Sequence, residues 1–120
     1  MKKHVMVIDD EVAIRDLLAR YLALAGYRVS GVGSAVEAEK LIVTDPPQVI
    51  ISDLQLEDSD GLVLIERLKA LLPDTPVILL TGVLFDPEVI AGTLSHKISS
   101  YLQKTTPLNK IVEEVRRLIG

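Results

Sequence analysis

The 120-residue chain has no cysteine and no tryptophan, and aromatic residues make up only 3% of it. Without cysteine there is no disulfide bond, no thiol nucleophile and no thiolate metal ligand. Hydrophobic residues still reach 48%, so the core must be aliphatic. That composition is typical of a folded domain rather than a disordered chain, and the length suits a single core.

Long apolar runs and an excess of basic charge are also missing. No stretch approaches the roughly 18–20 apolar residues that a membrane-spanning helix needs, and no signal peptide is visible. The net charge of −4 and the pI near 5.1 argue against direct nucleic-acid binding by this domain. We therefore expect one cytoplasmic domain over residues 1–120 that binds neither membranes nor nucleic acid.

What the sequence does contain is a regular alternation of strand and helix patterns. Short apolar runs predict five strands, over 4–8, 27–30, 48–52, 77–80 and 99–103. Amphipathic or capped segments predict five helices, over 12–25, 35–43, 61–72, 88–96 and from 108 onward. Strict alternation implies a parallel sheet with helices on both faces, joined by right-handed crossovers. Five such units suit the flavodoxin-like (βα)5 sandwich with strand order 2-1-3-4-5.

Three helix ends carry recognisable boundary signals. Ser34 and Glu37 have the spacing of a capping box at the start of the second helix. Gly26 is the expected C′ residue of the first helix, because glycine adopts the left-handed conformation found there. Thr106 and Pro107 are expected to cap the last helix.

Polar residues stand where four of the predicted strands end. The buried run 48–52 leads directly into Asp53, and the first strand leads into Asp9 and Asp10. Thr81 follows the fourth strand and Lys104 follows the fifth. Parallel strands deliver their carboxyl ends to one edge, where open α/β sheets bind ligands. We therefore expect these five side chains to share one crevice.

Three carboxylates in one crevice need a counter-charge. At about 5 Å and an effective dielectric near 20, each like-charged pair costs roughly 3 kcal/mol. Lys104 supplies one positive charge, and a divalent cation supplies two more. Oxygen ligands with several waters suit Mg²⁺ best, with Mn²⁺ as the alternative.

The predicted crevice has neither His nor Cys, which excludes hydrolysis by a Ser-His or Cys-His arrangement. It can present the Asp53 carboxylate as a nucleophile to a phosphoryl group. Lys104 would pair with one phosphoryl oxygen, and the Thr81 hydroxyl would donate to another. Positioning and charge stabilisation of this kind do most of the work in phosphoryl transfer.

These residues resemble the receiver domain of two-component response regulators, over essentially the whole chain. The resemblance is carried by Asp9-Asp10-Glu11, Asp53, Asp60-Gly61, Thr81-Gly82, Tyr101 and Lys104. Each motif alone is weak, but their order, spacing and placement at strand ends are together specific to that family.

The resemblance implies a role for each matched residue. Asp53 would be the phosphoacceptor, taking a phosphoryl group from a histidine of a sensor kinase or phosphotransfer protein. Asp9 and Asp10 would hold Mg²⁺ together with Asp53, and the main-chain carbonyl of Gln55 would complete the protein ligands. Lys104 would bind the acyl phosphate.

The resemblance also implies a switch rather than an enzyme, since such a domain assists only its own phosphorylation and dephosphorylation. Thr81 would move toward the phosphoryl group and Tyr101 would swing inward behind it. That movement would remodel the face formed by the fourth helix, fifth strand and fifth helix. A partner, or a second copy in a homodimer, would dock on this face. The resemblance leaves open three arrangements: an output domain beyond Gly120, a stand-alone receiver, or a piece of a hybrid kinase.

Two departures from the family pattern concern loops. The family usually has proline after the lysine, joined by a cis bond, whereas this chain has Thr105. A cis bond before a non-proline residue costs about 2.5–4 kcal/mol, so we expect either a trans bond with a shifted loop or a strained cis bond. Leu56 and Glu57 replace the usual Met-Pro, in a loop that is unusually acidic.

Two other functions are compatible with parts of the pattern. The chain could be an interaction module that keeps the fold and signals without phosphorylation. It could also be a phosphatase with an aspartyl nucleophile, but that class needs an Asp-x-Asp pair. Asp9 and Asp10 are adjacent, and adjacent strand residues point to opposite faces, so we do not expect such a pair.

Overall fold

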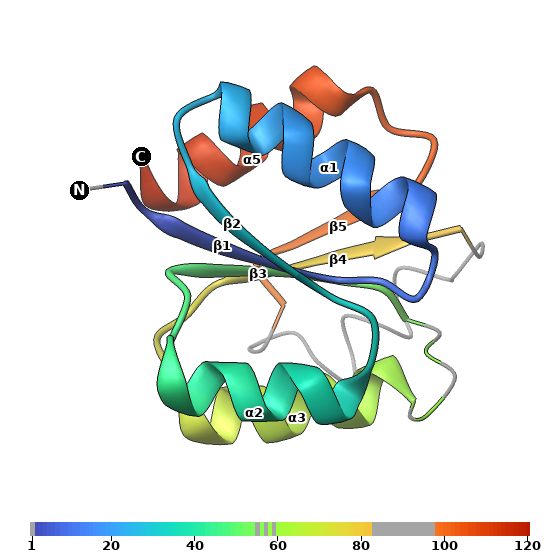
Figure 1. Cartoon of the computed structure of the whole chain (residues 1–120), viewed down its shortest axis with the longest axis vertical. Helices are drawn as coiled ribbons and strands as arrows, with labels where there is room; N and C mark the ends of the chain where they lie inside the picture. The colour runs from blue at the N-terminus through green and yellow to red at the C-terminus, as the bar shows by residue number, and fades with distance from the viewer. Residues whose placement is uncertain (1, 55, 57, 59, 83–97) are drawn as a thin grey trace.

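The computed structural model describes residues 2–54, 56, 58, 60–82 and 98–120, and these contain one five-stranded parallel sheet. Its strands are His4–Ile8 (β1), Arg28–Val32 (β2), Val49–Ser52 (β3), Val77–Thr81 (β4) and Ser100–Gln103 (β5). The strand order β2-β1-β3-β4-β5 confirms the predicted flavodoxin-like sheet (Figure 1).

Helices cover both faces of the sheet. The helices in the described ranges are Val12–Leu24 (α1), Ala35–Thr44 (α2), Gly61–Leu71 (α3) and Leu108–Ile119 (α5). Figure 1 shows α1 and α5 on one face, with α2 and α3 on the other. The helix predicted over 88–96 lies outside the described residues. Within the described ranges, no helix is both long and apolar enough to cross a membrane.

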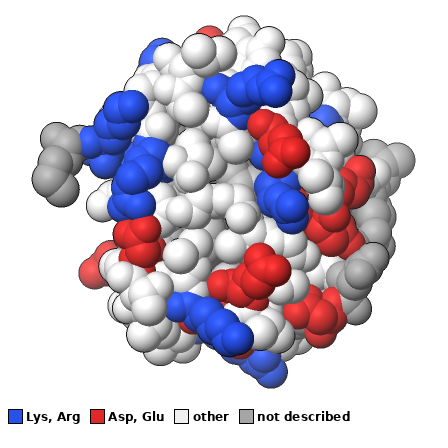
Figure 2. Space-filling view, in the orientation of Figure 1, with Lys and Arg blue, Asp and Glu red and all other residues white. Residues whose placement is uncertain are grey.

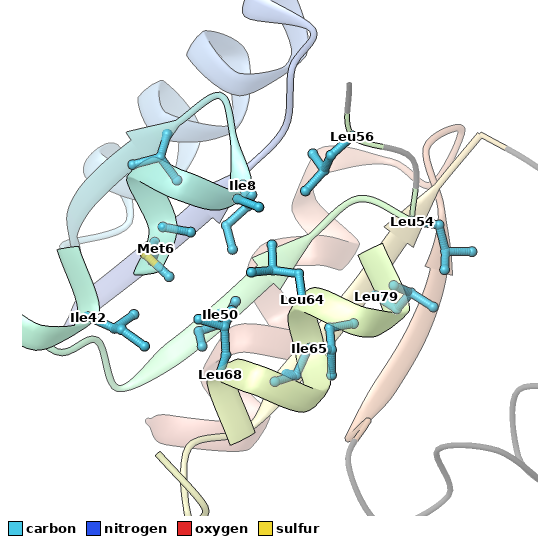
Figure 3. Packing of buried hydrophobic residues seen from close by; sticks show 14 residues of the cluster. Met6, Ile8, Ile42, Ile50, Leu54, Leu56, Leu64, Ile65, Leu68 and Leu79 are labelled. Atoms are coloured by element: carbon cyan, nitrogen blue, oxygen red, sulfur yellow. The ribbon is translucent and has the colours of Figure 1, made fainter. Parts of the chain in front are cut away.

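The aliphatic core is split by the sheet into two layers. Successive residues of β1 alternate between them: Met6 and Ile8 pack on the α2/α3 side, and Val5 and Val7 on the α1/α5 side. All five residues of β1 and of β4 are buried, which explains their continuous apolar sequence. Figure 3 shows the α2/α3 layer, where leucine and isoleucine side chains fill the space between α3 and the central strands.

Two predicted boundaries need correction. β2 covers residues 28–32 rather than 27–30, because it pairs residue for residue with β1 up to Ile8 and Val32. The last helix is capped by Pro107, whose carbonyl accepts the first helical hydrogen bond from Lys110, so Thr106 is not the cap. Gly26 is confirmed after the first helix, with φ of 101°.

The capping box of α2 is half confirmed. The Ser34 side chain accepts from the Glu37 N–H at 3.2 Å, as predicted. The Glu37 carboxylate, however, accepts from the N–H of Gly33, one residue before the cap. The second hydrogen bond of the box therefore comes from Gly33, in the loop between β2 and α2, and not from the N–H of Ser34.

Candidate functional site

Four strands deliver the predicted residues to the carboxyl edge of the sheet. β1 leads into Asp9 and Asp10, β3 into Asp53 and β5 into Lys104, while Thr81 is the last residue of β4. These four strands are neighbours in the order β1-β3-β4-β5, so their ends are adjacent. Acidic side chains border the right-hand side of the surface in Figure 2, where β4 ends in Figure 1.

The three aspartates form a compact oxygen cluster. Asp9, Asp10 and Asp53 each offer one carboxylate oxygen, and these atoms all lie within 4.8 Å of one another. Asp9 and Asp53 are almost fully buried, with exposed fractions of 2% and 5%. Three converging carboxylate oxygens suit a hard divalent cation, so this cluster fits a metal site.

The convergence of Asp9 and Asp10 corrects one expectation. Their side chains were expected to point apart, as adjacent strand residues do. β1 ends at Ile8, so strand alternation does not extend to the two acids, and both supply oxygen to the same cluster. The argument from alternation therefore does not apply to this pair.

Lys104 is the cation that faces this cluster. Its Nζ atom lies 3.0 Å from Asp53 Oδ2 and 3.0 Å from Asp9 Oδ2. It also lies 2.8 Å from Glu11 Oε1. The position of Lys104 is fixed by its main chain, whose N–H donates to the Thr81 carbonyl at 2.8 Å. The following bond to Thr105 is trans, since no described peptide bond is cis.

The protonation equilibria reflect this crowding. Burial raises the pKa of Asp9, and the nearby Asp53 charge adds to that effect, while hydrogen bonds from the Glu11 N–H and from Lys104 oppose it. Burial by itself would lower the pKa of Lys104, but its hydrogen bonds to Glu11, Asp53 and Asp9 outweigh burial and raise it. The site thus favours the charged form of Lys104, whereas burial disfavours the charged form of Asp9.

The predicted switch pair lies on one face of the sheet. Tyr101 pairs with Leu79, and Thr81 pairs with Gln103. Since side chains alternate along a strand, Thr81 shares the α2/α3 side with Leu79, and half-buried Tyr101 packs against the same core layer. Thr81 itself is fully buried. The two side chains are therefore diagonal neighbours across β4 and β5.

The Asp60-Gly61 motif has a structural cause. Asp60 caps α3 by accepting from the Leu62 N–H at 2.8 Å. A Cβ at position 61 would overlap the main-chain oxygens of Asp53 and Leu54, so only glycine fits there. The Gly61 N–H donates to the Leu54 carbonyl, which ties the start of α3 to the segment that follows β3. Gln55, expected to supply a main-chain ligand, lies outside the described residues.

Sequence reasoning missed two residues of the site. Glu11 was matched only as part of the Asp9-Asp10-Glu11 motif and was given no role, yet its carboxylate contacts Lys104. Arg15 was assigned no role, but its Nη1 donates to the main-chain carbonyl of Asp9 at 3.2 Å. The Arg15 side chain lies against Gly33, where a Cβ would overlap its guanidinium. Gly31 also lies against the Arg15 side chain, so these two glycines are the local signal for this contact.

Asp58 was also missed. Its two carboxylate oxygens accept from the N–H groups of Ala35 and Val36, at 3.0 and 3.3 Å. These hydrogen bonds, that from Ala35 most of all, lower the pKa of Asp58. The acidic residue thus links the loop after β3 to the first turn of α2.

The fold and the site together define an α/β domain with an acidic cluster and a lysine at the carboxyl edge of a flavodoxin-like sheet. The chain belongs to the response regulator receiver domain family, whose model matches residues 5–116. Receiver domains of this family are signalling switches of two-component systems. This membership confirms the resemblance found in the sequence.

Individual relatives agree with this assignment. The response regulator MprA of Mycobacterium ulcerans is 31% identical over 119 residues, which cover 99% of this chain and 51% of MprA. The chain therefore spans about half the length of the curated relatives that it matches. A CheY-like receiver domain protein from Methanospirillum hungatei has a TM-score of 0.90 at 25% identity, covering 98% of this chain and 93% of that one.

One similar structure contains a modified acid. It is a response regulator from Burkholderia pseudomallei with a phosphorylated aspartic acid, a calcium ion and citrate. It is 30% identical to this chain, with a TM-score of 0.83. The match covers 97% of this chain and 72% of that one.

Proposed function

We propose that Asp53 is a transient phosphate carrier, which receives a phosphoryl group from a histidine of a partner kinase or phosphotransfer protein. The observation that carries the proposal is the combination of three clustered carboxylates with Lys104 Nζ at 3.0 Å from Asp53 Oδ2. The phosphorylated aspartic acid in the Burkholderia pseudomallei relative supports it.

The proposed transfer is a displacement at phosphorus. One Asp53 carboxylate oxygen attacks, and an O–P bond forms while the P–N bond to the donor histidine breaks. The electron pair of that bond stays on the imidazole nitrogen, which then takes up a proton. Lys104 pairs with a phosphoryl oxygen, and the Thr81 hydroxyl donates to another.

A divalent cation completes this proposal. Asp9, Asp10 and Asp53 would hold Mg²⁺, or Mn²⁺ as the alternative, with the Gln55 main-chain carbonyl as a further ligand. When bound, the cation supplies positive charge to the phosphoryl oxygens. The buried Asp9 side chain keeps its place because its Oδ1 accepts from the Glu11 N–H at 2.9 Å.

Phosphorylation would be read out through Thr81 and Tyr101. Movement of Thr81 toward the phosphoryl group would vacate space on the α2/α3 side, and Tyr101 would move into it. The affected face would be the one expected from the sequence, formed by the fourth helix, β5 and α5, and it would contact a partner or a second copy. We propose that the chain is one cytoplasmic receiver domain over residues 1–120. The chain spans about half the length of MprA, which is consistent with an output domain beyond Gly120 as one of the arrangements open to it.

Mass spectrometry tests the phosphoacceptor directly. Incubation with acetyl phosphate and MgCl₂ should add one phosphoryl group, and neither Asp53→Asn nor EDTA-treated protein should gain it. Asp16→Asn, an exposed acid on α1, is the matched control and should be modified like the wild type. An adduct that survives Asp53→Asn would disprove the assignment, and a folded wild type that gains none would favour an interaction module that signals without phosphorylation.

A further inference from the structure

The number of N–H groups on the Lys104 ammonium equals the number of carboxylates around it. A lysine ammonium carries three N–H bonds, and the Lys104 Nζ has three carboxylates around it, those of Asp9, Asp53 and Glu11, at 2.8–3.0 Å. A phosphoryl oxygen that arrives at Asp53 needs one of these N–H groups. A phosphoryl oxygen therefore competes with these three carboxylates for Lys104.

Burial decides which carboxylate leaves. The Asp9 side chain is 2% exposed and is also held by a main-chain N–H, so its release would leave a buried charge unpaired. Asp53 is itself the acceptor and stays next to the phosphoryl group. The Glu11 side chain is 57% exposed and returns to water at little cost.

We propose that Glu11 is the displaceable partner of Lys104, a tuning residue whose place at the ammonium is taken by a phosphoryl oxygen. This inference rests on the proposed function of Asp53. Glu11 competes with the incoming group for Lys104, and so slows phosphorylation of the resting protein. Its side chain caps no helix N–H, so its replacement removes no helix cap.

Three variants test the proposal by their rate of phosphorylation with acetyl phosphate and saturating MgCl₂. Glu11→Gln should be faster by roughly two- to fivefold, the range that corresponds to one partly exposed ion pair. Glu11→Asp keeps the charge but shortens the side chain, so its rate should rise toward that of Glu11→Gln. Asp16→Asn removes an exposed charge of α1 that does not contact Lys104, and its rate should equal that of the wild type.

The outcomes distinguish a direct contact of Glu11 with Lys104 from a general effect of the negative charge at position 11. If Glu11→Gln is no faster than the wild type, or if Glu11→Asp matches the wild type while Glu11→Gln is faster, competition at Lys104 is disproved. If the wild type is not phosphorylated at Asp53 at all, the proposed function fails and this inference falls with it.

A metal-free measurement tests the contact without phosphorylation. In EDTA, acetic anhydride should acetylate Lys104 roughly two- to fivefold faster in Glu11→Gln than in the wild type, because loss of one ion pair favours the neutral amine that reacts. Lys110, an exposed lysine on α5, is the internal standard in the same digest. Equal Lys104 labelling in the two proteins would show that Glu11 does not hold the lysine, and would overturn the proposal.

Discussion

Charged side chains are paired differently at the two ends of the sheet. At the amino end, Arg28 and Asp45 form a bidentate ion pair, with Nη1–Oδ2 and Nη2–Oδ1 distances of 2.6 and 2.9 Å. Hydrogen bonding to Arg28 lowers the pKa of Asp45. Buried His4 lies beside them, with its Nε2 2.7 Å from the Ser30 hydroxyl. Arg28 and Asp45 thus have a partner of opposite sign, and His4 has a neutral hydrogen-bonding group.

At the carboxyl end, several carboxylates share a single ammonium, that of Lys104. Asp9, Asp10 and Asp53 cluster together, one ammonium pairs with Asp9 and Asp53, and burial raises the pKa of Asp9. A site arranged for stability alone would not bury a carboxylate that lacks a full counter-charge. The contrast supports the proposal that the carboxyl end receives a cation and a phosphoryl group, at the expense of stability.

Replacement of Lys104 should have the largest effect on the free energy of unfolding. Without metal, Lys104→Met should lower the free energy of unfolding by about 2–4 kcal/mol, because it leaves buried carboxylates uncompensated. Added MgCl₂ should restore part of the loss. Urea unfolding with EDTA or MgCl₂ measures both effects. Arg28→Met at the amino end is the control and should cost less, since that pair is exposed. An equal cost at both ends would contradict the comparison.

Replacement of the buried acid Asp9 should stabilise the metal-free protein, whereas replacement of Lys104 should destabilise it. Asp9→Asn should raise the metal-free free energy of unfolding by about 1 kcal/mol, because it deletes a buried charge that Asp53 repels. The same variant should lose most of the stabilisation that MgCl₂ gives the wild type. Thermal unfolding with and without MgCl₂ provides the measurement. The matched variant Asp45→Asn should be destabilised instead, and stabilisation of both variants would refute the distinction.

The functional end could be predicted largely from the sequence, because its residues follow strand ends. A continuous apolar run ending in a polar residue places that residue at the carboxyl edge whatever the strand's exact length. Asp53 and Lys104 were therefore located correctly, although β3 and β5 each start one residue later than predicted. The bounds of β2 were less predictable, because pairing with β1 sets them rather than local pattern.

Contacts of exposed acids with residues far away in the sequence could not be predicted in this way. Glu11 meets Lys104 across 93 positions of sequence, and Asp58 reaches Ala35 across 23. Neither acid belongs to a periodic pattern that would orient its side chain. The need for glycine at position 61 was visible only as a motif, since its cause is the close approach of the Asp53 carbonyl.

The smallest expected effect is a difference in pH dependence between the two ends. The folded pKa of Asp9 is raised, so ionised Asp9 costs stability at neutral pH, and the cost vanishes as pH falls through that pKa toward the unfolded value of about 3.9. The folded pKa of Asp45 is lowered, so its contribution is present above about pH 3.9 and is lost only below it.

Between pH 7 and about pH 4, the stability difference between Asp9→Asn and the wild type should therefore shrink. The difference between Asp45→Asn and the wild type should stay nearly constant over the same range, and should close only in stronger acid. Urea unfolding in EDTA at several pH values measures both. Parallel pH profiles for the two variants would mean that the acids at the two ends experience the same electrostatic environment, contrary to the contrast drawn from their partners.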